Sequence, residues 1–323
     1  MTTVDAALYG RLALVTGGAS GIGKAVCQLL AADGVTVVVA DIQLEAAENV
    51  ARALPGDAKH QAMYVDVGEP LSVEQLFNGI RGAFSEPLSI VVHCAGILRA
   101  APLSQCTDKL FDEIIKIELK RHVAILQHFA VSDKSTDVQQ LELRMSQGLG
   151  AKAEPPMVMT LRRLKITFGL MTYRRDYQSC FWCFQGTFLV NRAAIRDMLR
   201  SGKPLSDWRG AIVNVSSLAA RCGSVQPCAY GAAKAGVQAL TKSAASEVAK
   251  HGIRCNVVVP GWVDTPMMAE AGESNKTRVI SNTPLKRTGQ PMEVAEAIKF
   301  LCSPTTSSFI TGTVLEVTGG FKM

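Results

Sequence analysis

The chain has no hydrophobic run as long as the roughly 20 residues that a membrane-spanning helix requires. Its longest apolar stretches have the length of β-strands. The N-terminal stretch MTTVDAALYGRLALV also lacks the basic start and the apolar core of a secretory signal. We therefore expect no membrane span and no cleaved secretory leader.

Metal-binding spacings are also missing. The nine cysteines are scattered, and Cys180 with Cys183 forms the one CxxC pair. No second cysteine pair and no histidine pair stands at the distance typical of a zinc site. We therefore expect no metal, and we interpret the cysteines as reduced, mostly buried thiols in a reducing compartment.

A strong excess of charge is absent outside one segment. The net charge is +6, but residues 121–185 hold nine basic and five acidic residues, which leaves +2 for the rest. That balance is ordinary for an enzyme and does not favour a nucleic-acid partner. The basic and aromatic stretch 161–184 is the one part that resembles an RNA- or membrane-binding patch; we expect no such role.

A glycine-rich turn near the N-terminus indicates a phosphate-binding loop. Residues 11–15 predict a buried strand, TGGASGIG follows, and 22–33 predict a helix. Gly17, Gly21 and Gly23 would let the backbone turn tightly and approach a pyrophosphate closely. The start of the helix would present its free N–H groups to the anion.

A second predicted strand, 35–40, ends on Asp41. An acidic residue about 20 residues after such a glycine turn is suited to hydrogen-bond the hydroxyls of an adenosine ribose. Asp41 would repel a 2′-phosphate, and Ile42 supplies no cation to attract one. We therefore expect NAD rather than NADP as the cofactor.

The first part of the chain alternates predicted strands and helices, which favours a doubly wound parallel sheet with helices on both faces. The second half resumes a regular pattern after residue 185. The predicted strands are 11–15, 35–40, 61–65, 89–93, 211–215, 253–258 and a last VLEV strand; the predicted helices are 22–33, 43–54, 71–84, 108–120, 186–202, 227–250 and 291–302.

Acid–base chemistry is indicated by Tyr230 and Lys234 in the stretch YGAAK, with Ser217 upstream in IVNVSS. Four residues apart on a helix, the tyrosine and lysine lie on one face. The lysine ammonium would favour the phenolate, so the tyrosine could exchange a proton near neutral pH. The serine hydroxyl could hold a substrate oxygen.

Together these motifs resemble the short-chain dehydrogenase/reductase family, a single-domain Rossmann type. The resemblance is carried by TGGASGIG, Asp41, Asp66, HCAG at 93–96 in place of the usual NNAG, Ser217, YGAAK, RCNVVVPGWVDTP and ITGTVLEVTGG. GIRCNVVVPGWVDTPM and TGTVLEVTGGFKM resemble the branch of 17-beta-hydroxysteroid dehydrogenase type 8 and 3-oxoacyl-[acyl-carrier-protein] reductase in particular.

The resemblance implies roles for individual residues. Tyr230 would be the general acid and base, Lys234 would bind the nicotinamide ribose, and Ser217 would orient the substrate oxygen. The residues that would contact the cofactor are Gly17, Ser20, Gly21, Ile22, Gly23, Asp41, Asp66, Val67, Cys94, Ala95, Gly96, Tyr230, Lys234, Pro260, Gly261, Val263 and Thr265.

One helix departs from the family pattern. The family has an asparagine there, and this chain offers Glu118 or Cys183, depending on the side from which it is aligned. We predict a single domain over 1–323 whose central helix is split by a poorly ordered insertion, 121–185. Either the insertion is a genuine arm for a partner, or it is intron-derived or misassembled sequence, which we favour. Without it, 258 residues remain.

The expected function is reversible oxidation of a secondary alcohol to a ketone with NAD. The hydrophobic substrate would be a 3-hydroxyacyl or 3-oxoacyl thioester, or a 17-beta-hydroxysteroid. The alternative is an NAD-binding scaffold subunit that the insertion has impaired. The related branch implies the mitochondrial matrix, with the cytoplasm as the alternative, and a homo- or hetero-tetramer with a related reductase subunit.

Overall fold

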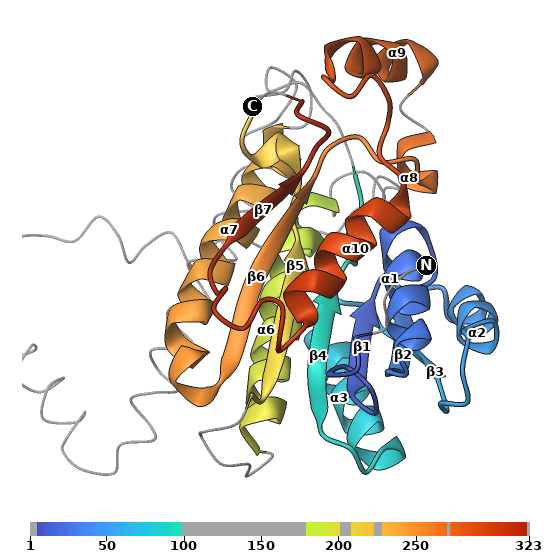
Figure 1. Cartoon of the computed structure of the whole chain (residues 1–323), viewed down its shortest axis with the longest axis vertical. Helices are drawn as coiled ribbons and strands as arrows, with labels where there is room; N and C mark the ends of the chain where they lie inside the picture. Colours follow the sequence, from blue (N-terminus) through green and yellow to red (C-terminus); the bar gives the residue numbers. More distant parts are fainter. Residues whose placement is uncertain (1–4, 99–178, 201–207, 223–227, 270–271, 322–323) are drawn as a thin grey trace, which may run out of the picture. The chain divides into compact units, whose positions relative to one another are not determined.

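Seven parallel strands form one sheet in the order β3-β2-β1-β4-β5-β6-β7 (Figure 1). The structure is a computed structural model that describes residues 5–98, 179–200, 208–222, 228–269 and 272–321. All of these residues belong to one unit of the chain. The strands are β1 Leu12–Thr16, β2 Thr36–Asp41, β3 Gln61–Tyr64, β4 Leu88–His93, β5 Gly210–Val215, β6 Ile253–Pro260 and β7 Val314–Val317.

Helices cover both faces of the sheet. They are α1 Gly21–Ala32, α2 Leu44–Arg52, α3 Pro70–Ala83, α6 Ser179–Arg200, α7 Cys228–Val248, α8 Pro266–Ala269, α9 Glu273–Asn282 and α10 Pro291–Cys302, with short 3-10 helices η2 Leu218–Ala220 and η3 Ala249–His251. Side chains alternate along each strand, so the sheet has two separate cores. One core packs against α1 and α10, and the other against α3, α6 and α7.

The predicted fold class, a doubly wound parallel sheet, is confirmed. The predicted helix 291–302 also has the bounds of α10, because its start is strongly specified. Pro291 stands at the first helical position, and the Glu293 carboxylate accepts a hydrogen bond of 2.8 Å from the Gln290 N–H. Helix α9 was not predicted; none of its residues is buried, so no apolar periodicity marks it.

The predicted insertion 121–185 needs a correction at its C-terminal end. Helix α6 begins at Ser179, so residues 179–185 form its first turns. The Gln185 side chain is buried and donates a hydrogen bond of 2.7 Å to the Gly68 carbonyl. The polar and aromatic composition of this stretch concealed its helical structure. The rest of the insertion, the predicted helix 108–120 and Glu118 lie outside the described residues.

Cys27, Cys255 and Cys302 are buried thiols, and Cys94 and Cys222 are partly buried. Among the described residues, no cluster of histidine, cysteine and acidic side chains has the arrangement of a metal site. No helix in the described ranges has both the length and the apolar character required to cross a membrane.

Candidate functional site

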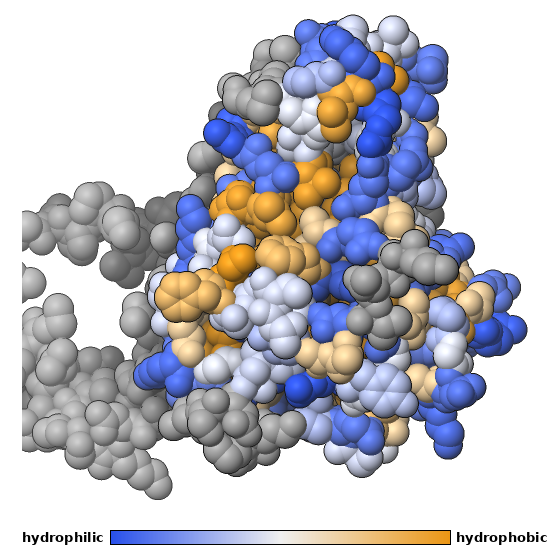
Figure 2. Space-filling model, viewed as in Figure 1, coloured by the Kyte–Doolittle hydropathy of each residue, from blue (hydrophilic) through white to orange (hydrophobic). Residues whose placement is uncertain are grey.

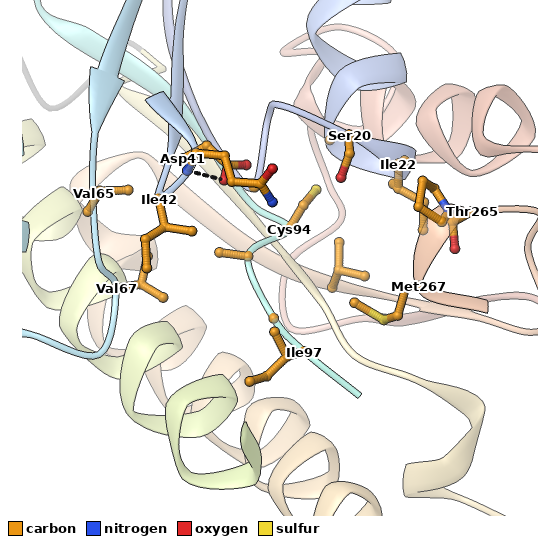
Figure 3. Close-up of a pocket in the computed structure, with 18 of the residues that line it drawn as sticks. Ser20, Ile22, Asp41, Ile42, Val65, Val67, Cys94, Ile97, Thr265 and Met267 are labelled. Atoms are coloured by element: carbon orange, nitrogen blue, oxygen red, sulfur yellow. Dashed lines mark hydrogen bonds between the residues drawn. The ribbon is translucent and has the colours of Figure 1, made fainter. Parts of the chain in front are cut away.

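A cavity of about 420 Å³ lies where β1, β2 and β4 end (Figure 3). At this point β1 separates β2 from β4, so the connections on its two sides diverge and leave a crevice. Figure 3 shows Asp41 and Ile42 at one end of the cavity and Thr265 and Met267 at the other. The lining residues are Gly17, Ser20, Gly21, Ile22, Gly23, Asp41, Ile42, Gln43, Val65, Asp66, Val67, Cys94, Ala95, Gly96, Ile97, Val215, Thr265, Pro266 and Met267.

The glycine loop between β1 and α1 forms one wall. Gly17 has a φ of +70°, and a Cβ there would lie 2.7 Å from the Ala95 nitrogen. A Cβ on Gly23 would lie 2.1 Å from the Gly17 carbonyl oxygen. Helix α1 starts directly after this turn, and Ser20 makes no side-chain capping bond to its first turn. Free backbone N–H groups are therefore available to a pyrophosphate, so the loop fits a dinucleotide.

Asp41 ends β2 at the edge of the same cavity. One carboxylate oxygen accepts a hydrogen bond from the Ala19 N–H at 3.1 Å, and the other accepts one from the Gln43 N–H at 3.0 Å. These bonds fix the carboxylate beside the glycine loop and leave further lone pairs on both oxygens. A ribose diol could donate to those lone pairs. The next side chain, Ile42, is 50% exposed and offers no positive charge.

Asp66 also lines the cavity, but it shapes its own turn. Its carboxylate accepts a hydrogen bond from the Gly68 N–H at 2.9 Å, and its N–H donates to the Ser72 hydroxyl at 2.9 Å. The residue that caps α3 is Glu69, not Asp66. Asp66 therefore has a structural role in the turn, and a contact with an adenine would come in addition to it.

Lys234 and Tyr230 lie on α7, at the carboxyl end of β5. Lys234 is 5% exposed, and its ammonium donates a hydrogen bond of 2.9 Å to the Val215 carbonyl at the end of β5. The same nitrogen lies 5.8 Å from the centre of the Tyr230 ring. Val215 itself lines the cavity. The hydrogen bond from Lys234 to Val215 therefore connects α7, the helix that also holds Tyr230, to the wall of the cofactor cavity.

Ser217 follows β5 in the segment that packs against the start of α7. Its hydroxyl accepts a hydrogen bond from the Ala219 N–H at 3.2 Å, so it caps η2. A Cβ on Gly231 would lie 2.8 Å from the Ala219 carbonyl oxygen. Because Gly231 has no side chain, η2 can pack closely against α7 at this residue, which directly follows Tyr230. The structure brings the predicted catalytic residues to one end of the sheet.

Beneath this site runs a row of buried polar side chains that the sequence did not predict. Thr16, His93 and Asn214 stand opposite one another on β1, β4 and β5. The Thr16 hydroxyl and the His93 Nδ1 are hydrogen-bonded at 2.8 Å, while the His93 Nε2 has no hydrogen-bond partner in the part of the chain that the structure describes. Burial and, to a lesser degree, the nearby positive charge of Lys234 lower the His93 pKa to about 3. His93 is therefore neutral at physiological pH.

Most of the predicted cofactor residues line the cavity, but five of them do not. Pro260 ends β6, Gly261 packs against Thr318, and Val263 is 4% exposed within the core. The other two are Tyr230 and Lys234. Thr265 lies next to the glycine loop, because a Cβ on Gly21 would be 3.2 Å from its Cγ2.

Several cavity residues were missed by the sequence reasoning. Their positions in the sequence could have indicated them, since each lies within two residues of a predicted site residue. The missed residues are Ile42, Gln43, Val65, Ile97, Val215, Pro266 and Met267.

Comparison with known proteins decides the family. A model described as short chain dehydrogenase matches residues 11–135, and one described as Enoyl-(Acyl carrier protein) reductase matches residues 182–322. A (3R)-3-hydroxyacyl-CoA dehydrogenase of Mus musculus is 32% identical over 324 residues, covering 98% of this chain and 98% of that protein. The chain belongs to the short-chain dehydrogenase/reductase family. It is therefore an oxidoreductase, of a family that generally binds NAD(P).

Other members of the short-chain dehydrogenase/reductase family match over similar lengths. A cis-4-hydroxycyclohexanecarboxylate dehydrogenase of Sinomonas cyclohexanicum is 33% identical over 314 residues, covering 96% of each protein. A crystal structure of a short-chain type dehydrogenase/reductase from Mycobacterium marinum has a TM-score of 0.72 at 24% identity and covers 98% of each chain. That structure supports the fold alone.

Proposed function

We propose that this chain is an NAD(H)-dependent oxidoreductase that interconverts the secondary alcohol and the ketone of a 3-hydroxyacyl thioester. The observation that carries the proposal is the Tyr230–Lys234 pair, which stands beside the cavity lined by the glycine loop and Asp41. Bound NAD would supply the hydride acceptor, and NADH the hydride donor.

Proton transfer would belong to the chain's own residues. Tyr230 would donate its proton to the ketone oxygen on reduction and take it back on oxidation. The Lys234 ammonium, fixed by the Val215 carbonyl, would stabilise negative charge on the phenol oxygen during the transfer. The Ser217 hydroxyl would hold the substrate oxygen, and its bond to the Ala219 N–H leaves its own proton free to donate.

The substrate class is supported by the relatives. The Mus musculus protein is named for (3R)-3-hydroxyacyl-CoA, and the second relative for a ring-borne secondary alcohol. Both substrates carry a hydroxyl on a carbon skeleton with a carboxyl-derived group. A 17-beta-hydroxysteroid remains the alternative substrate.

Cofactor choice is expected to depend on Asp41. Replacing Asp41 with alanine should weaken NADH binding about ten- to a hundredfold, because hydrogen bonds to a charged group contribute about 1.5–3 kcal/mol. The same change should narrow the preference for NADH over NADPH, since it removes the charge that repels a 2′-phosphate. Fluorescence titration of both cofactors measures these constants.

The control for that titration is Asp57→Ala, which removes an exposed aspartate from the loop before β3. It should leave both constants unchanged. Tighter binding of NADPH than NADH by the wild-type protein would contradict the assignment of NAD.

Turnover separates the proposed enzyme from a dinucleotide-binding scaffold without activity. We expect the purified full chain to form NADH from NAD⁺ and a (3R)-3-hydroxyacyl-CoA, followed by NADH absorbance. Estradiol in place of the thioester tests the steroid alternative. Saturable NADH binding with no turnover of either substrate would favour the scaffold.

We further propose that the enzyme assembles as a tetramer and that the β7 edge of the sheet forms one of its interfaces. Strand β7 is the last strand and is only partly buried. Figure 2 shows apolar residues gathered around β7 and beside α10, and Phe300 and Phe309 are 40% and 103% exposed. An exposed apolar edge of this kind favours association. Light scattering measures the mass; a monomer at assay concentration would contradict the proposal.

A further inference from the structure

The chain leaves the sheet after Val263 and returns at Gly289, and the two ends of this excursion are fastened together. Val263 and Gly289 form an isolated parallel bridge. The Asp264 N–H donates to the Gly289 carbonyl at 2.9 Å, and the Gly289 N–H donates to the Trp262 carbonyl at 2.9 Å. Helices α8 and α9 lie between these ends, beyond the carboxyl ends of the strands (Figure 1).

Asp264 stands at the centre of this junction. One of its carboxylate oxygens accepts hydrogen bonds from the Thr288 hydroxyl at 2.7 Å and from the Gln290 side-chain amide at 3.0 Å. The other oxygen lies 3.5 Å from the Lys276 ammonium on α9. One carboxylate thus contacts the returning segment and α9, while its own backbone belongs to the departing segment.

Helix α9 depends on such polar contacts, because none of its residues is buried in a core. The C-terminal end of α9 lies close to Gly319. The Leu285 N–H donates a hydrogen bond to the Gly319 carbonyl, and the Thr283 methyl is so near that a Cβ on Gly319 would stand 2.9 Å from it. Its N-terminal half has the Lys276–Asp264 ion pair. Without that pair, the N-terminal half of the helix would lose its ion pair with the junction, while the C-terminal anchor would remain.

The junction also borders the cofactor cavity. Thr265, Pro266 and Met267, the three residues after Asp264, line that cavity. A second cavity of about 430 Å³ shares Thr265 and Pro266 with it and is lined by Trp262, Asp264, Thr265, Pro266, Met268, Ala269, Gly272, Glu273 and Lys276. Much of this lining is apolar, and α9 forms one side of it. Movement of α9 would therefore change the space available to an apolar group beside the cofactor.

We propose that Asp264 is a positioning residue that holds α9 in place, through Lys276, so that the second cavity keeps its shape for the apolar part of the substrate. The identity of the substrate in this inference rests on the proposed function. The role of Asp264 in positioning α9 is independent of the proposed function. Asp264 does not line the cofactor cavity formed by the described residues.

Hydrogen exchange of the α9 amides tests the positional role directly in the full chain. Asp264→Asn and Lys276→Met should each accelerate exchange in α9, and Asp264→Ala should do so most, because it also removes the acceptor of Thr288 and Gln290. Asp264→Asn combined with Lys276→Met should exchange no faster than the faster single variant, since both remove one interaction. Unchanged exchange in all variants, or additive effects, would overturn the proposal.

Kinetics supply the second measurement. For a long-chain (3R)-3-hydroxyacyl-CoA, Asp264→Asn and Lys276→Met should raise KM roughly two- to fivefold, the range that a partly exposed ion pair supports. Their kcat and NADH dissociation constant should stay near the wild-type values. Equal KM values in active variants would overturn the role in substrate positioning.

Arg278→Gln is the matched control. It removes a positive charge from the same helix, but Arg278 is exposed, does not line the second cavity and has no ion pair in the described residues. It should leave both exchange and KM unchanged; effects equal to those of Lys276→Met would overturn the specific role of the ion pair. If the wild-type chain shows no turnover, the proposed function fails, while the exchange experiment still decides the role of Asp264.

Discussion

Replacing Tyr230 with phenylalanine is expected to lower kcat by about two to four orders of magnitude, the usual contribution of a general acid or base. The phenylalanine keeps the ring and removes only the hydroxyl that would transfer the proton. The ring lies 5.8 Å from the Lys234 ammonium, which the Val215 carbonyl holds in place. NADH binding should therefore change little. Steady-state turnover and fluorescence titration of the same preparation measure the two effects.

Tyr9→Phe is the control for this experiment. Tyr9 is 76% exposed and does not line the cofactor cavity, so loss of its hydroxyl should leave kcat unchanged. Wild-type turnover by the Tyr230→Phe protein would show that another group transfers the proton, and the proposed mechanism would then be wrong.

The second large effect concerns acid stability and depends on His93. Its pKa is about 3 in the folded chain, chiefly because of burial, and near 6.5 for an ordinary histidine in the unfolded chain. Between these values the unfolded chain binds a proton that the folded chain does not. The contribution of His93 to the free energy of unfolding is therefore greatest above about pH 6.5, and it decreases as the pH falls toward 3. The slope is on the order of 1.4 kcal/mol per pH unit.

Urea unfolding at a series of pH values measures this slope. His93→Asn, which keeps a polar side chain but removes the titrating group, should flatten the dependence in that range. His60→Asn is the control: burial also lowers the His60 pKa, but His60 is only partly buried, so its removal should have a smaller effect. Equal slopes for the wild type and His93→Asn would contradict the prediction.

The same geometry predicts how acid would affect the site. A proton on His93 would place a second buried positive charge near Lys234, whose charge already contributes to the low His93 pKa. The His93 Nε2 has no partner in the described residues that could share such a proton. We therefore expect loss of activity at low pH to accompany loss of structure.

Much of the cofactor site could be predicted because its parts are local in sequence. The glycine turn, the start of α1 and the acid at the end of β2 form within one strand–helix–strand unit. In a parallel sheet the carboxyl ends of strands meet at one edge, so Asp41, Asp66 and the residues after β4 were expected to converge there. The cavity lined by these residues agrees with that expectation.

Prediction was less accurate where the local pattern is weak. Residues 179–185 were assigned to the insertion because the regular, family-like pattern resumes only after residue 185, yet they begin α6. Pro260, Gly261 and Val263 were predicted as cofactor contacts from the family motif, and these contacts stay predictions. Val263 points into the core, where α10 and the sheet surround it.

By itself the sequence determined the order of strands and helices, the glycine loop, and the placement of Tyr230 and Lys234 on one helical face. These features depend on periodicity and on spacings of a few residues. Only the tertiary structure decided the Thr16–His93 hydrogen bond, whose partners stand 77 residues apart, and the contacts of Asp264 with residues 12 to 26 positions later. Such pairs form when separate strands and loops meet, because burial and sheet register, rather than local spacing, choose which polar groups face each other.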